Sequence, residues 1–294
     1  MRVLRLLVLL AILGVFAAVG LWITRPMTED PDQVSALTPD VENGKAVFFA
    51  GGCASCHAAE GSSDDAKQTL AGGQAFPSQF GTFYAPNISS DPTYGIGEWS
   101  ALDLINAMKH GTSPTGTHYY PAFPYASYAK ADVQDIVDLR AYLATLPADE
   151  TTNTAHAVGF PYNIRALLGG WKMLFLNDDW VRTSADTPEL ERGRYLVEAL
   201  GHCAECHTPR NILGGMKTNE WLIGAPNPSG KGRAPGISPD TLDWGADDIA
   251  EYLNSGFTPD FDSVGGHMAA VVENTANLSD SDRAAIGAYL KALP

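Results

Sequence analysis

Apolar residues recur at helical spacing in two distant segments of the chain. Between positions 132 and 146 they include Ile136 and Leu139, and between 279 and 293 they include Ile286. Residues three and four apart lie on one face of an α-helix, so each segment is predicted to be an amphipathic helix. A proline follows each of them, as is common just beyond a helix end.

A shorter amphipathic stretch precedes each of these helices. The first runs from Trp99 to Gly111 and the second from Trp244 to Gly256, with the same number of residues in both. Helices often end at a glycine in the left-handed conformation, so both stretches are predicted to be glycine-capped helices. The chain therefore contains a repeat. Each half would have an opening helix, a long loop, a middle helix, a second loop and a final helix.

The long loops are rich in glycine, proline, asparagine and serine, as at 70–87 and 213–239. Neither shows the strong alternation of apolar and polar residues that is typical of a half-buried strand. We therefore expect an all-α fold with one domain at 40–148 and a second domain at 187–294.

The segment at 149–186 between the two halves contains a hydrophobic portion. Leu167, Trp171 and Leu174 lie at helical spacing within it. Such a helix can lie on a membrane or bind a partner. It can also link the two domains and pack them together, which is the interpretation we favour.

The N-terminus carries a long uncharged run from Leu6 to Thr24, preceded by Arg2 and Arg5 and followed by Arg25. The run is long enough to span a bilayer as a helix. A cleaved signal peptide is the alternative, but no convincing A-x-A cleavage site precedes Arg25. We expect an uncleaved membrane anchor at 1–25. The positive-inside rule then places the N-terminus in the cytoplasm and the rest of the chain outside.

The net charge is strongly negative, because 34 acidic residues stand against 19 basic ones. A surface of this charge repels nucleic acid, so we expect no nucleic-acid partner. It can steer a basic protein towards this chain, although acidity is also a common route to solubility.

All four cysteines fall in two C-x-x-C-H strings, at 53–57 and 203–207. This is the attachment motif of c-type haem, in which the histidine binds the iron. A disulfide framework is unexpected in so long a chain with so few cysteines, and a zinc site leaves the adjacent histidines unexplained. We predict two covalently bound haems c. The thioether bonds would come from Cys53, Cys56, Cys203 and Cys206, and the proximal iron ligands would be His57 and His207.

This arrangement of helices around each string resembles the class I cytochrome c domain. The resemblance implies that the first and last helices of each half cross, and that loops close the haem pocket. It also implies a second axial ligand, usually a methionine from the loop before the last helix, whose thioether favours ferrous iron.

The repeat locates that methionine in the second half. Counted from the glycine that ends each middle helix, Met268 occupies the same position as Phe123. We therefore predict Met268 as the iron ligand opposite His207, with core packing as its alternative role. The adjacent His267 is the competing ligand. Met216 is interpreted as packing.

The first half offers no such methionine, because Phe123 cannot coordinate iron. His118, in the same loop, is one candidate for the sixth ligand, and an open or water-bound iron is the other. Met108 and His110 belong to the middle helix and are discounted.

Several strings outside the haem motifs are distinctive: Pro86-Asn87-Ile88-Ser89, Tyr120-Pro121-Ala122-Phe123-Pro124-Tyr125 and Pro161-Tyr162-Asn163-Ile164-Arg165. They resemble the multihaem cytochrome c subunit of membrane-bound alcohol and gluconate dehydrogenases. The resemblance covers residues 40 to 294. It implies transfer of electrons from a dehydrogenase to a quinone or another carrier.

This sequence departs from that family in two ways. The family subunits usually carry three haems, whereas this chain has two motifs. Their first domain typically has a methionine ligand where this chain has Phe123. The resemblance therefore implies membrane-tethered electron transfer for this chain, but it does not imply a particular dehydrogenase partner.

Two functions follow from these observations. The first is a membrane-anchored dihaem cytochrome c without independent catalysis. Its haem domains would lie in the periplasm, where they would relay electrons between dehydrogenases or other cytochromes and the respiratory chain. The second is a dihaem peroxidase, in which the first iron has an open face that reacts with peroxide.

Overall fold

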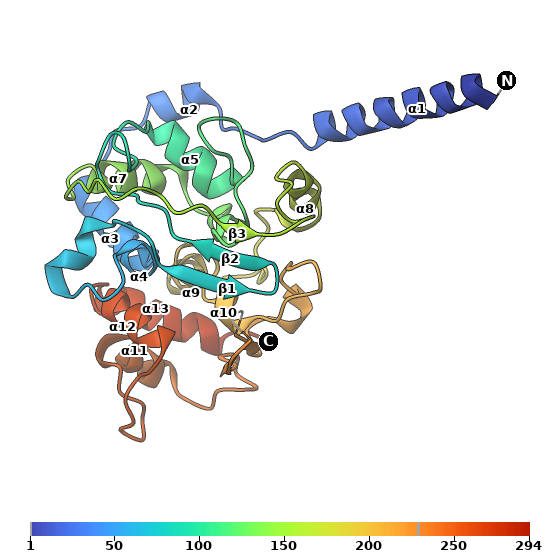
Figure 1. Ribbon diagram of the computed structural model, residues 1–294. Coiled ribbons are helices and arrows are strands. Elements are labelled where there is room, and N and C mark those ends of the chain that lie inside the picture. Colours follow the sequence, from blue (N-terminus) through green and yellow to red (C-terminus); the bar gives the residue numbers. More distant parts are fainter. Residues whose placement is uncertain (1, 228–229) are drawn as a thin grey trace.

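The computed structural model describes residues 2–227 and 230–294 and is shown in Figure 1. One long helix, α1 (Arg2–Ile23), extends away from a body of short helices and loops. The first half of the body contains α2 (Pro31–Ser35), α3 (Val41–Ala50), α4 (Cys53–His57), η1 (Asp64–Thr69), β1 (Ala75–Ser78), β2 (Gly81–Tyr84), α5 (Ala101–His110), α6 (Tyr125–Tyr128) and α7 (Val133–Leu143). Then follow β3 (Ala157–Val158), α8 (Leu167–Phe175), α9 (Pro188–Arg194), η2 (Tyr195–Leu200), α10 (Ala204–His207), η3 (Thr218–Glu220), β4 (Ala225–Pro226), β5 (Arg233–Ala234), α11 (Ala246–Ser255), α12 (His267–Thr275) and α13 (Asp280–Lys291).

A pair of crossing helices organises each half. Helix α3 packs against α7 in the first half, and α9 packs against α13 in the second. A glycine lies at each crossing, because a Cβ atom at Gly44 would overlap the carbonyl of Asp138, and one at Gly193 would overlap the carbonyl of Ala285. The final helices predicted from apolar spacing are therefore present, and glycine lets the backbones approach closely.

The opening helix of the second half contains a π-helical turn, η2, directly before its C-x-x-C-H string. There the amide of Gly201 donates to the carbonyl of Leu196, five residues earlier, at 2.7 Å. The second half has one residue more than the first between the crossing glycine and the motif. The π turn takes up this extra residue, so that helix and motif keep the same relation in both halves.

The two middle helices form where the amphipathic stretches predicted them. Helix α5 begins at a capping box formed by Ser100 and Asp103. It ends at Gly111, whose φ is 57°, and α11 ends at Gly256, whose φ is 76°. Both glycines adopt the left-handed conformation that their place after the helix predicted.

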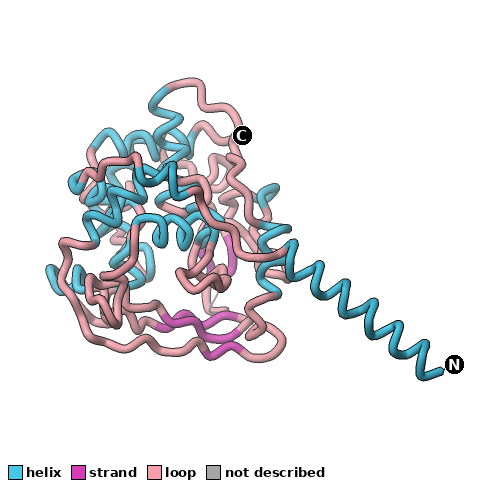
Figure 2. The backbone as a smooth tube through the Cα atoms, turned by 90° about the horizontal axis from the view of Figure 1, so that it is seen from above, coloured by secondary structure: helices cyan, strands magenta, loops and turns pink. Residues whose placement is uncertain are grey.

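The expectation that the loop at 70–87 contains no strand was wrong. Strands β1 and β2 form an antiparallel hairpin with Ala75 opposite Tyr84, and β3 pairs with β2. The tube in Figure 2 shows this small sheet at the edge of the molecule. Its residues do not alternate between core and solvent strongly enough to give a sequence signal. Pairing with the distant segment at 157–158, and a hydrogen bond from the Tyr84 amide to His156 Nδ1 at 3.1 Å, help to hold it.

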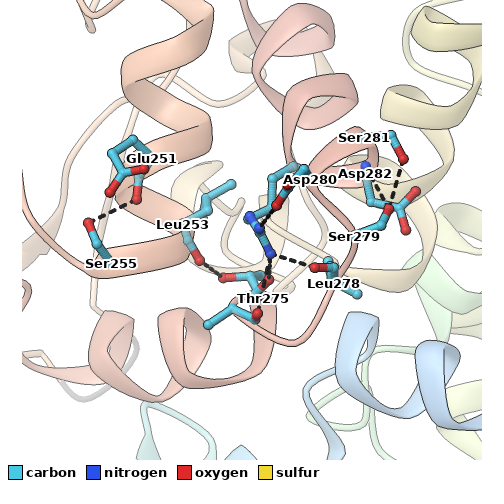
Figure 3. A network of polar contacts seen from close by, with 11 residues as sticks. Glu251, Leu253, Ser255, Thr275, Leu278, Ser279, Asp280, Ser281 and Asp282 are labelled. Atoms are coloured by element: carbon cyan, nitrogen blue, oxygen red, sulfur yellow. Dashed lines mark hydrogen bonds and ion pairs between the residues drawn. The ribbon is translucent and has the colours of Figure 1, made fainter.

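Helix α12 is tied to both of its neighbours by a buried polar network (Figure 3). The hydroxyl of Thr275 donates to the Leu253 carbonyl of α11 at 2.6 Å. The buried guanidinium of Arg283, on α13, donates to the carbonyls of Thr275 and Leu278. These hydrogen bonds to main-chain carbonyls join α12 to α11 and α13 and fix its position.

The segment between the halves contains the predicted linker helix as α8. On one side, the Nζ of Lys172 donates to the carbonyls of His110 and Gly111 at the end of α5. On the other, the Nε1 of Trp171 donates to the carbonyl of Leu213 at 2.9 Å. The helix thus contacts both halves of the body.

The glycine at the second crossing gives a test of this packing. We expect Gly193→Ala to lower the free energy of unfolding by about 2 kcal/mol, because the new methyl group meets backbone rather than a movable side chain. Gly170→Ala in α8 is the control, since nothing lies within 4 Å of its Cβ position. Chemical denaturation of the two variants measures the difference. Equal stability would contradict the crossing.

Candidate haem-binding sites

The first C-x-x-C-H string forms a separate short helix, α4. Gly52, with φ of 58°, ends the continuity with α3 and lets the chain turn into α4. Cys53 and Cys56 are three residues apart, so their side chains lie on one face of this helix. Both are free cysteines, as are the two in the second string.

The imidazole of His57 is held by the backbone. Its Nδ1 lies 2.8 Å from the carbonyl oxygen of Pro86, to which a neutral imidazole donates. The Nε2 atom is then the nitrogen with a free lone pair. Burial lowers the pKa of His57, which favours the neutral form, and the Pro86 carbonyl partly opposes this shift. A neutral ring with one oriented nitrogen is what iron ligation requires.

The second string repeats this arrangement. The Nδ1 of His207 lies 2.7 Å from the carbonyl oxygen of Pro235. The carbonyl of each histidine also accepts an equivalent bond, from the Gly72 amide at 2.7 Å in the first half and the Gly224 amide at 2.8 Å in the second. The two halves therefore position their histidines by the same main-chain contacts.

The sequence analysis did not identify the two proline carbonyls as functional groups. A signal was present, because Pro86-Asn87-Ile88-Ser89 and Pro235-Gly236-Ile237-Ser238 share the pattern Pro-x-Ile-Ser. In both strings the isoleucine amide donates to a leucine in the left-handed conformation, Leu70 or Leu222. The shared pattern thus marks the loop that wraps around each histidine.

The residues present fit a covalent haem c. Each motif offers two unpaired thiols one helical turn apart, beside a histidine whose Nδ1 is already bonded. Burial raises the pKa of Cys53 to about 12 and that of Cys203 to about 12. These thiols therefore lack the low pKa of a catalytic cysteine.

The distal side of the first half is aromatic at the position where a methionine was sought. The ring of Phe123 lies 6.1 Å from that of Tyr119 and 5.8 Å from that of Tyr128, measured between centroids. The side chain packs against the core and offers no atom that can ligate iron.

His118 is buried and already has a partner. Its Nε2 lies 3.0 Å from the carbonyl oxygen of Thr24, just beyond the end of α1. Its Nδ1 is buried and has no hydrogen-bond partner among the described residues. The other candidates are also engaged, with His110 Nε2 3.3 Å from the Glu29 carboxylate and Met108 in the core. Ligation by His118 stays a prediction.

Met268 lies in the first turn of α12, rather than in an open loop as the sequence analysis described it. It is half-buried, whereas His267 is exposed. The network of Figure 3 ties the C-terminal end of this helix to α11 and α13. Met216 packs against the core, as interpreted from its position. The role of Met268 as iron ligand stays a prediction.

The two attachment segments meet at one interface. The Nε2 of His202 lies 3.3 Å from the carbonyl oxygen of Gly51, and each residue is close to its own motif. The hydroxyl of Tyr128 donates to the same carbonyl at 3.4 Å, and its ring stacks edge-on with His202, 5.5 Å away. The fold therefore brings the two C-x-x-C-H strings face to face.

Crossing helices, a C-x-x-C-H string and a histidine oriented by a proline carbonyl define a c-type cytochrome. Comparison with known proteins agrees with this class, because residues 41–147 match the family described as cytochrome c. The chain belongs to the cytochrome c family.

Three relatives show how the similarity is distributed. The chain is 54% identical over 285 residues to a diheme cytochrome c-type protein of Cereibacter sphaeroides, covering 97% of this chain and 96% of the relative. It is 34% identical over 288 residues to the fructose dehydrogenase cytochrome subunit of Gluconobacter japonicus, covering 92% of this chain and 56% of that subunit. It is 34% identical over 303 residues to the cytochrome c subunit of the quinone alcohol dehydrogenase of Komagataeibacter europaeus, covering 95% and 60%.

These comparisons confirm the resemblance to cytochrome c subunits of quinone-dependent dehydrogenases. They support covalently bound haem c as the cofactor and electron transfer as the role.

The glycine behind the first histidine loop gives a test of the site. A Cβ atom at Gly72 would lie 2.5 Å from the carbonyl carbon of Pro86, so Gly72→Ala should displace the acceptor of His57. A weaker bond at Nδ1 makes the imidazole a poorer donor to ferric iron. We expect the midpoint potential of the haem bound there to rise, as measured by redox titration.

The matched control is Gly73→Ala. Gly73 also has a positive φ, but nothing lies within 4 Å of its Cβ position. We expect an unchanged potential in this variant. An equal shift in both variants would show that left-handed strain, and not the Pro86 carbonyl, controls the site.

Proposed function

We propose that this protein is a membrane-anchored dihaem cytochrome c that relays electrons in the periplasm. It would consist of an anchor at 1–25, a cytochrome c domain at 40–148, a linker at 149–186 and a second domain at 187–294. Crossing helices, glycine-capped middle helices and a proline-bound histidine in each half support the two-domain division. The diheme description of the Cereibacter relative supports two haems.

The observation that carries this proposal is the interface between the two attachment segments. When bound, an iron porphyrin supplies a one-electron carrier at each motif. His202 and Tyr128 converge on the Gly51 carbonyl, which holds the two motifs at a fixed separation. Ser127 donates to Glu205 at 3.3 Å, and Lys67 pairs with Glu273, so the halves are joined at further points. A relay needs such a rigid arrangement more than it needs a substrate pocket.

Membrane anchoring rests on α1. Its 22 residues would extend about 33 Å, close to the thickness of a bilayer core of about 30 Å. By length and composition it is the one helix of the described residues that is apolar enough to cross a membrane. Arg2 and Arg5 at its start favour a cytoplasmic N-terminus, which would leave both domains on the periplasmic side of the inner membrane.

Redox proteins are the proposed partners. Three of the relatives are named as cytochrome subunits of fructose, gluconate and alcohol dehydrogenases, and this chain spans 56 to 60% of their length. We therefore propose a dehydrogenase or another cytochrome as the donor and a respiratory-chain component as the acceptor. A net charge of −15 would steer a basic partner towards the surface.

The two haem sites would differ in their sixth ligand. We propose Met268 as the ligand opposite His207, because it is half-buried in the first turn of α12, a helix tied to α11 and α13. The first half has Phe123 at the corresponding position, so its iron would be open or bound by His118. A thioether raises the reduction potential relative to histidine or water. Electrons would then pass from the first domain to the second.

A spectroelectrochemical titration of the intact protein tests both parts of this proposal. We expect two one-electron steps, of which the higher belongs to the second domain. Met268→Ala should lower that step and leave the lower one unchanged, whereas Met216→Ala is the control and should move neither. A single step, or a variant at 268 that moves the lower step, would overturn the proposal.

A further inference from the structure

Helix α8 turns an apolar face outward. Leu167, Met173 and Leu174 are 58%, 64% and 68% exposed. Leu167 and Leu174 share one face of the helix and Met173 lies on the adjoining face, whereas Lys172 lies opposite the two leucines and is buried, as is Gly169. A surface helix of a soluble protein has the opposite arrangement, with its charged residue in water and its apolar residues in the core.

The orientation of α8 is fixed rather than incidental. The ammonium group of Lys172 donates to the carbonyls of His110 and Gly111, at 2.6 Å and 2.7 Å. It also lies 4.9 Å from the centroid of the Tyr125 ring. Because the lysine caps the end of α5, the helix cannot rotate its apolar residues inward without losing both hydrogen bonds.

The segment before α8 also exposes large apolar side chains. Phe160, Tyr162 and Ile164 are 80%, 50% and 42% exposed. Together with the three residues of α8, they form what we call the apolar platform. Exposed apolar groups gathered in this way mark a site of interaction with a protein or a membrane.

The platform lies beside the point where the anchor ends. A Cβ atom at Gly169 of α8 would overlap the carbonyl oxygen of Thr24, which follows α1 directly. The same carbonyl accepts from Nε2 of buried His118. Figure 1 shows α8 on the side of the body from which α1 extends. The chain therefore leaves the end of its apolar helix within contact distance of α8.

We infer that the apolar platform lies in the boundary between lipid headgroups and acyl chains, and holds the first domain against the membrane surface. This inference rests on the proposed anchoring by α1. If α1 spans the bilayer and ends at Ile23, the next residue, Thr24, lies at the bilayer surface, and α8, which contacts Thr24, lies there too. Tyrosine in the platform and Trp22 near the helix end are typical of this boundary.

The attraction would be apolar rather than electrostatic. Asp178 and Asp179 follow α8 and are exposed, and the whole chain is acidic. Such charges disfavour binding to anionic headgroups. Because no anionic headgroup is needed, vesicles of neutral phosphatidylcholine can test whether the platform inserts.

Single added cysteines give a direct measurement. In the proposed holoprotein all four native cysteines form thioether bonds to haem, so Met173→Cys provides one free thiol for a spin label. The protein is reconstituted in phosphatidylcholine vesicles, and the relaxation of the label by oxygen and by a water-soluble nickel complex is compared. Leu10→Cys in α1 is the control for insertion. Phe261→Cys, at a site 87% exposed in the loop between α11 and α12, is the control for an aqueous site.

We expect the labels at 10 and 173 to be relaxed by oxygen in preference to nickel, and the label at 261 to show the reverse. An inserted label at 10 with a water-exposed label at 173 would overturn the inference and leave the anchor intact. That outcome would also assign the platform to a protein partner. A water-exposed label at 10 would remove the anchor, and with it the basis for the inference.

Discussion

The hydrogen bond between a motif histidine and a proline carbonyl controls more of this structure than any other contact. It engages Nδ1 and leaves Nε2 as the nitrogen that would bind a haem iron, and it requires a loop to pass behind the imidazole. In the first half, that loop needs Leu70 in the left-handed conformation and a glycine at 72, where a side chain would strike the Pro86 backbone. These two backbone features position the Pro86 carbonyl that accepts the hydrogen bond from His57.

The second half reaches the same geometry by a different local route. Its opening helix carries one more residue, and the π turn at Tyr195–Leu200 takes up the difference. Gly193 still lies at the helix crossing, and the Nδ1 of His207 still meets the carbonyl of Pro235. The histidine geometry is thus maintained while the helix before it adapts, as expected if iron ligation is the constraint that must be met.

The sequence predicted the helices well because their apolar spacing and glycine caps are local signals. Gly111 and Gly256 mark helix ends that the structure places at the same residues. The hairpin of β1 and β2 gave no such signal, because β1 alternates only between exposed and half-buried residues, and part of its support comes from the distant strand β3. The contact of His118 with Thr24 was hidden for the same reason. The C-x-x-C-H strings are visible in the sequence, whereas the main-chain partners of their histidines belong to tertiary structure.

We propose that the protein has two haem sites that share their proximal side and differ on their distal side. Phe123 packs among tyrosines in one half, and Met268 is held in a fixed helix in the other. Low-temperature EPR of the oxidised protein, with near-infrared magnetic circular dichroism, tests this claim most directly. We predict two distinct ferric signals and an iron–methionine charge-transfer band with the intensity of one haem. Two equivalent methionine-ligated haems would contradict it.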